Sequence, residues 1–127
     1  MAKTKTGTPD YFFKIKNLTK KTVLSNNAAL CTDIISKVVG LMFSAKQEKD
    51  LVFRFRRKAP IYLHMFFVFY PIDALFLNEK FEVVDKKERF MPFTFYKSKD
   101  AMYAIELSCG ILKKTNTSLG DIISIKK

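Results

Sequence analysis

The sequence predicts a single mainly-β domain, a sandwich or barrel of about eight short strands with one amphipathic helix packed on it. Segments rich in Val, Ile, Phe and Tyr recur along the chain, separated by turns every 8–12 residues or so, a spacing typical of sandwiches and barrels. Only the stretch that begins at Thr32 has apolar residues at helical spacing. The 127 residues are enough for one domain, expected at 10–127 after a flexible basic N-terminus at 1–9.

The first third of the chain supplies three strands and the helix. Residues 11–15 alternate apolar and basic side chains, as a half-exposed strand does, and residues 22–24 and 28–31 are short strand candidates. Thr32 is a suitable N-cap for the helix. The stripe that would pack on the sheet consists of Ile34, Ile35, Val38, Leu41 and Met42.

The most apolar stretch, HMFFVFYPIDALFL at residues 64–77, should be the buried centre of the domain. Pro71 disfavours a helix, so two strands hinged at this proline are predicted, at 61–70 and 72–77. Side chains alternate in a strand, so Asp73 shares one face with two leucines and enters the core as a carboxylate. It must find hydrogen-bond donors or a cation there.

The other strands follow from alternation and turn residues. In the strand at 51–55, Leu51, Phe53 and Phe55 should point inward, and a basic turn at 57–60 should follow it. Several segments after residue 77 complete the prediction. They are strands at 81–84, 101–107 and 122–125, a charged stretch at 86–89, an irregular or edge segment at 90–96, and a helical turn within 109–115.

Three ionisable groups stand in the most apolar strands, namely His64, Asp73 and Glu106. We expect a pocket near them that binds a small ligand or a protein partner. The structural alternative is a core histidine, with carboxylates that accept hydrogen bonds from backbone N–H groups. A hydrolase that uses Asp73 and Glu106 as a pair is a further alternative, and it needs the two carboxylates about 5–10 Å apart across a cleft. No nucleophile motif decides whether the protein is an enzyme.

Charge suggests another alternative. Lys and Arg number 23 against 12 Asp and Glu, a net charge of +11, which could steer the protein toward nucleic acid. The candidates for weak nucleic-acid binding are Arg54, Arg56, Arg57 and Lys58, which are interleaved with Phe53 and Phe55. Both phenylalanines should face the core, which leaves no exposed stacking platform there. Lysines spread over the whole chain are equally typical of a thermophile-like, archaeal-like surface.

Two cysteines and one histidine argue against a zinc site, so neither a metal nor a cofactor is expected. Cys31 and Cys109 should be buried free thiols. The longest apolar run is shorter than the roughly 20 residues of a membrane-spanning helix. The N-terminal sequence has no export-signal pattern, so a cytoplasmic location is expected.

Several motifs occur in an order known from one family. They are Gly40-Leu41-Met42-Phe43, HMFF at 64–67 leading to PIDALFL at 71–77, YAIEL at 103–107, and Gly120-Asp121. From about Tyr11 to Ile125 the chain resembles the family called "domain of unknown function 192". The resemblance implies a compact, mainly-β fold of about this length and no established activity. The chain departs from the family pattern at Pro92-Phe93, where many members have Pro-Trp followed by Arg.

Overall fold

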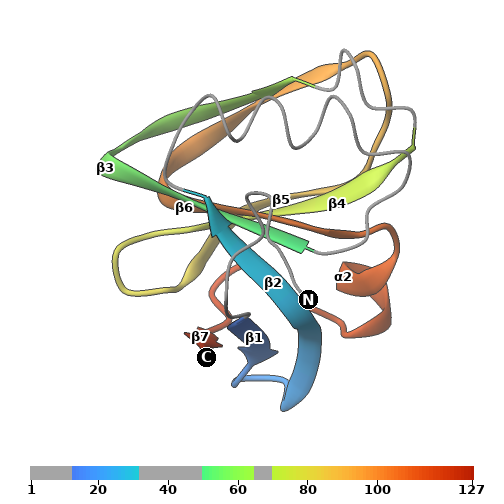
Figure 1. The fold of residues 1–127 in the computed structure, drawn as a ribbon. Helices are drawn as coiled ribbons and strands as arrows, with labels where there is room; N and C mark the ends of the chain where they lie inside the picture. Colours follow the sequence, from blue (N-terminus) through green and yellow to red (C-terminus); the bar gives the residue numbers. More distant parts are fainter. Residues whose placement is uncertain (1–12, 32–49, 65–69) are drawn as a thin grey trace, which may run out of the picture.

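The computed structural model describes residues 13–31, 50–64 and 70–127, and this part of the chain confirms the mainly-β class (Figure 1). The N-terminal tail at 1–9 and the helix predicted from Thr32 lie outside the described residues. The described elements are β1 (Phe13–Asn17), β2 (Thr22–Cys31), β3 (Asp50–His64), β4 (Ile72–Leu77), β5 (Val83–Phe90), β6 (Phe95–Ser108), α2 (Ile111–Lys114) and β7 (Ile123–Lys126).

The described strands form one seven-stranded sheet in the order β5-β4-β6-β3-β2-β1-β7. Neighbours pair antiparallel, except that β2 and β3 pair in parallel. Within the described residues the sheet is not a closed barrel, but its two ends meet at one point. There the Val83 N–H donates to the Asp121 carbonyl at 2.9 Å, and the Gly120 N–H donates to the Val83 carbonyl at 2.8 Å.

The longest strands, β3 and β6, form a bent two-stranded ribbon, called the β3–β6 ribbon below. Their register is interrupted between Arg54 and Ala59 and again between Pro60 and Tyr62. Such irregularities bend paired strands and increase their twist. Figure 1 shows both strands turning back sharply at the left of the view, so that the two halves of the ribbon face each other as arms.

The two faces of the sheet carry separate hydrophobic clusters. The arm cluster fills the inside of the bend and consists of Phe53, Ile61, Leu63, Ile72, Ala74, Phe76, Phe90, Ala101 and Ala104. The base cluster lies on the opposite face of β4 and β6 and includes side chains from β1, β2, β7 and α2. It consists of Ile15, Leu24, Ala28, Val52, Leu75, Leu77, Val83, Ile105, Leu107, Leu112 and Ile123. Strand alternation explains this division, since consecutive β4 residues enter the two clusters in turn.

Several strands are longer than the sequence predicts. The segments 22–24 and 28–31 belong to one strand, β2, and the basic turn predicted at 57–60 is wrong because β3 runs through it. Exposed basic residues at the bend of the ribbon resemble a turn in sequence. The charged stretch 86–89 lies in β5, an edge strand of the sheet, where charged side chains are common. The predicted helical turn within 109–115 is confirmed as α2.

Candidate functional site

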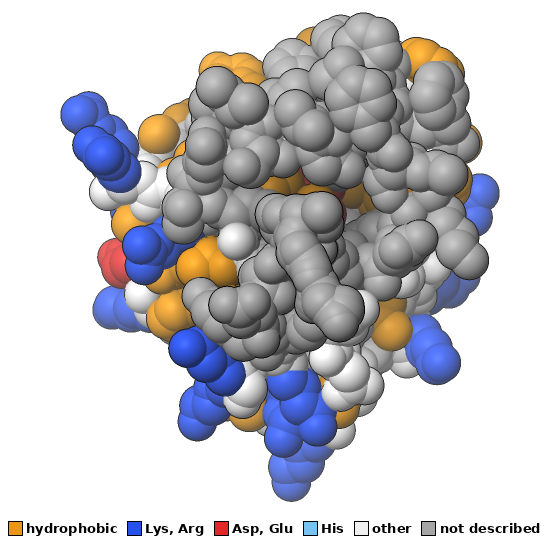
Figure 2. Space-filling model, viewed as in Figure 1, with side chains coloured by type: hydrophobic (Ala, Val, Ile, Leu, Met, Phe, Trp, Pro, Cys, Tyr) orange, Lys and Arg blue, Asp and Glu red, His pale blue; other side chains and the backbone are white. Residues whose placement is uncertain are grey.

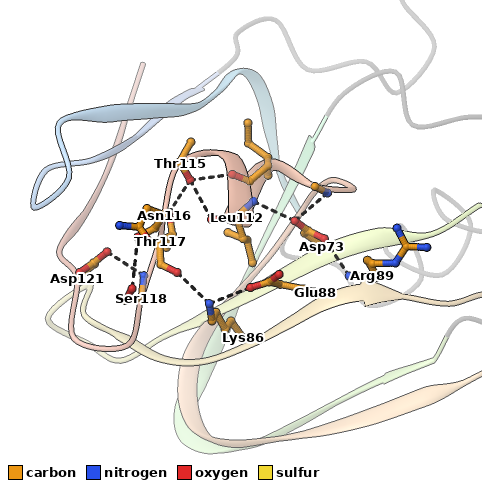
Figure 3. A network of polar contacts seen from close by, with 12 residues as sticks. Asp73, Lys86, Glu88, Arg89, Leu112, Thr115, Asn116, Thr117, Ser118 and Asp121 are labelled. Atoms are coloured by element: carbon orange, nitrogen blue, oxygen red, sulfur yellow. Dashed lines mark hydrogen bonds and ion pairs between the residues drawn. The ribbon is translucent and has the colours of Figure 1, made fainter.

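Asp73 lies in β4 on the base-cluster face and is 0% exposed. One carboxylate oxygen accepts a hydrogen bond from the Arg89 N–H at 3.0 Å. The other accepts from the N–H groups of Gly110 and Leu112, each at 3.0 Å (Figure 3). Three backbone donors from two other segments therefore compensate the buried charge.

These contacts fix the segment that follows β6. Gly110 has a φ of 95°, a left-handed conformation that suits glycine, and it precedes α2. Because Asp73 anchors α2, the fully buried side chain of Leu112 packs in the base cluster. Asp73 acts in the structure as an anchor for α2 and for the end of β5, which is the structural alternative considered for it.

A second polar network holds the chain around Asp121, and Figure 3 shows its contact with Ser118. Its carboxylate accepts hydrogen bonds from the Asn17 side chain at 2.9 Å, the Lys20 ammonium at 2.8 Å and the Ser118 N–H at 2.9 Å. Burial opposes ionisation, but the hydrogen bonds from Asn17, Lys20 and Ser118 lower the pKa of Asp121 below its ordinary value. The network ties β1 to the turn before β7, which is a structural role.

Glu106 lies in β6 on the other face of the sheet and is 1% exposed. Its register partners are Leu51 on β3 and Ala74 on β4, so its side chain projects from the same face as theirs, into the region of the arm cluster. Burial among apolar neighbours disfavours the charged form and raises the pKa of Glu106 to about 8 from an ordinary 4.5. At neutral pH this carboxyl group therefore keeps its proton in most molecules.

The three predicted pocket residues do not all come together. Asp73 pairs with Leu107 and Glu106 pairs with Ala74, so the two carboxyl groups project from opposite faces of the sheet. They do not flank a common cleft, which the hydrolase alternative required. The backbone of His64 ends β3 beside Phe95, and its side chain lies outside what the structure describes.

Two further buried carboxyl groups were missed from the sequence. Asp85 accepts hydrogen bonds from the Tyr96 hydroxyl and the Lys99 N–H, each at 3.0 Å. Burial raises the pKa of Asp50, and hydrogen bonds from Ser25 and Ser108 act against that rise. The charged stretch around Asp85 resembles an exposed loop in sequence. Only its pairing within the sheet buries this carboxyl group.

The predicted nucleic-acid candidates are all exposed. Arg54, Arg56, Arg57 and Lys58 lie along the middle of β3. Lys58 makes one contact of 3.5 Å with Glu79. Phe53 is buried and Phe55 is half-buried against the arm cluster, so their predicted inward orientation is confirmed.

The described residues contain no group of three or more metal-ligating side chains. None of the helices in this part of the chain is long and apolar enough to span a membrane. Cys109 is a free thiol, as expected, but it is exposed, so the prediction that it is buried is wrong. It follows the last residue of β6, where the chain leaves the sheet for α2.

Comparison with known proteins decides the family. Residues 15–125 match the DUF192 family model, described as "Uncharacterized ACR". The chain belongs to the DUF192 family. A UPF0127 protein from Thermococcus sibiricus is 34% identical over 110 residues, which cover 84% of this chain and 71% of that protein. A UPF0127 protein from Thermococcus gammatolerans is 29% identical over 112 residues, covering 87% of this chain and 73% of that protein.

The resemblance seen in the sequence is therefore confirmed, and these DUF192 relatives come from thermophilic archaea. Two solved structures share the fold. A Sinorhizobium meliloti protein described as a candidate transcription regulator superposes with a TM-score of 0.77 at 20% identity, over 89% of this chain and 91% of its own. A Novosphingobium aromaticivorans protein of unknown function superposes with a TM-score of 0.75 at 15% identity, over 88% of this chain and 82% of its own. These likenesses concern the fold alone.

The anchoring role of Asp73 predicts that Asp73→Asn lowers the free energy of unfolding by about 3 kcal/mol. The neutral amide accepts hydrogen bonds through one oxygen only, so at least one buried N–H loses its partner. Urea denaturation measures the loss. Asp100→Asn is the matched control, because Asp100 is exposed and its substitution should change stability by less than about 0.5 kcal/mol. Equal effects of the two substitutions would contradict the role.

The raised pKa of Glu106 predicts how stability depends on pH. Between pH 4.5 and about 8 the folded carboxyl group holds a proton that the unfolded chain releases. Ionisation therefore favours unfolding, and this residue makes stability fall as pH rises, by at most about 1.4 kcal/mol per pH unit. Glu106→Gln should remove that slope. Denaturation of both proteins across this range measures the difference, and parallel curves would count against a raised pKa.

Proposed function

We propose that this protein is a binding module for a small, largely apolar ligand that carries a positive charge, held at Glu106 on the inside of the bent β3–β6 ribbon. The observation that carries the proposal is the fully buried carboxyl group of Glu106, whose strand neighbours Leu51 and Ala74 are apolar. Asp73 is not part of this site, because its hydrogen bonds lie on the other face.

A carboxyl group in this position is costly for folding. A leucine or methionine in a central strand would pack without the desolvation that burial of a carboxyl group brings. Strongly perturbed ionisable groups at buried positions are concentrated at functional sites. A cationic ligand bound nearby would favour the ionised form of Glu106.

The aromatic character of the arm cluster supports a cation as the ligand. The rings of Phe76 and Phe90 lie with their centroids 5.7 and 6.3 Å from that of Tyr96. Aromatic faces attract cations, and more strongly where water is excluded. The ammonium group of Lys87 already lies 5.8 Å from the centre of the Tyr96 ring, an example of this attraction within the cluster.

Charged side chains of β5 lie on the same sheet face as Glu106. On the same sheet face, β5 contributes Asp85 opposite Phe76 and Lys87 opposite Ala74. Asp85 is held by the Tyr96 hydroxyl and two backbone N–H groups. A bound cation would come closest to Glu106 and would lower its pKa. Binding would therefore release a proton below about pH 8.

A cytoplasmic location is part of this proposal. The exposed thiol of Cys109 supports it, because exposed free cysteines are typical of reducing compartments.

Calorimetric titration with benzyltrimethylammonium tests the function, and benzyl alcohol is the uncharged comparison. The cation should bind more tightly as pH rises, by up to about tenfold per unit until about pH 8, since the ionised carboxylate binds it. Glu106→Gln should weaken binding of the cation at least tenfold and leave the affinity for benzyl alcohol unchanged. Glu79→Gln, at an exposed carboxylate, is the control. Absence of cation binding at every pH, or equal binding by Glu106→Gln, would refute the proposal.

A further inference from the structure

The outside of the β3–β6 ribbon carries exposed aromatic side chains. Tyr62 on β3 is 57% exposed and Phe95 on β6 is 63% exposed. Their strand neighbours Ile61, Leu63 and Tyr96 belong to the arm cluster or pack against it. Because side chains alternate, the two exposed rings project from the opposite side of the ribbon, away from the arm cluster.

The two rings are close to each other on paired strands. Tyr62 pairs with Lys97, and His64 pairs with Phe95, in a regular antiparallel register. This makes Tyr62 and Phe95 diagonal neighbours, about 7–8 Å apart along the sheet surface. Backbone pairing of both strands holds them, so they stand on a rigid surface.

Basic side chains lie on the same strands as these rings. The ammonium group of Lys97 lies 5.9 Å from the centre of the Tyr62 ring, and Lys99 is exposed two residues along the strand. Residues 54–58 continue the basic character along β3 toward the bend. Among the described residues nearby, Asp100 is an exposed acid, and Glu79 is within 3.5 Å of Lys58. Figure 2 shows Lys and Arg side chains projecting around the edge of the molecule.

We propose that this outer surface binds single-stranded nucleic acid, with bases stacked on Tyr62 and Phe95 and with phosphates held by Lys97, Lys99 and the basic residues of β3. Aromatic rings interspersed with cations are the common basis of single-strand binding without sequence preference. This surface is distinct from the Glu106 site, which lies on the inner side of the same ribbon. It supplies the stacking platform that Phe53 and Phe55, which point inward, do not provide.

Single strands fit better than the other anionic partners. In a duplex the bases are stacked on one another, so the rings could not reach a base face without unstacking. Insertion into a lipid surface would instead involve the exposed apolar side chains between β5 and β6, which are Met91 and Phe93. The rings of Tyr62 and Phe95 alternate with buried side chains along paired strands, and the Lys97 ammonium lies beside Tyr62. This arrangement suits a base with its adjoining phosphate.

Fluorescence anisotropy with short labelled oligo(U) and oligo(dT) tests the surface, with a duplex of equal length as comparison. The wild-type chain should bind the single strands more tightly than the duplex, and affinity should fall steeply between about 50 and 200 mM salt. Tyr62→Ala with Phe95→Ala should weaken binding at least tenfold, since each stacked base contributes strongly to affinity. Lys97→Gln should reduce the slope of log affinity against log salt by about 0.7.

Matched controls use exposed residues elsewhere, Leu119→Ala for the rings and Lys113→Gln for the charge. Both should bind as the wild type does. Tyr62→Ala alone keeps the test valid if the double variant unfolds. The inference is overturned if no oligonucleotide binds at low salt, if the ring variants bind as tightly as the controls, or if only phosphatidylserine vesicles bind and lose that binding in the ring variants. Binding of benzyltrimethylammonium should persist in the ring variants, which separates this test from that of the Glu106 site.

Discussion

Backbone hydrogen bonds between β4 and β6 place Ala74 beside Glu106 and Leu107 beside Asp73. Since side chains alternate along each strand, this register sends the two carboxyl groups to opposite faces of one sheet. A shift of one residue in the pairing of these strands would move every side chain of one strand to the opposite face of the sheet. The position of α2 depends on this pairing, because Asp73 holds α2 on the base-cluster side.

The two faces therefore differ in what their buried acid does. On the base-cluster face, three backbone N–H groups compensate Asp73, and the result is a fixed connection between β4, β5 and α2. On the arm-cluster face, burial raises the pKa of Glu106 to about 8 and so disfavours its ionised form. A stabilising acid and a candidate binding acid lie in neighbouring strands, separated by the thickness of the sheet.

Local patterns in the sequence were enough for the fold class and for the inward side chains of single strands, such as Phe53. They also placed Asp73 with Leu75 and Leu77. They could not decide whether Asp73 and Glu106 share a face, because that depends on pairing between strands some thirty residues apart. Tyr62 was missed for a similar reason: its segment is apolar enough to be a core strand, and only the bend of the β3–β6 ribbon gives it an outer side.

Burial keeps the carboxyl group of Glu106 protonated at neutral pH. Carbon-13 NMR titration of the glutamate side-chain carboxyl carbons measures this directly, with Glu106→Gln used to assign the resonance. A midpoint near pH 8 is the result predicted. A midpoint near the ordinary value of 4.5 would show that burial does not disfavour the ionised carboxylate, and the proposed binding role would have to be abandoned.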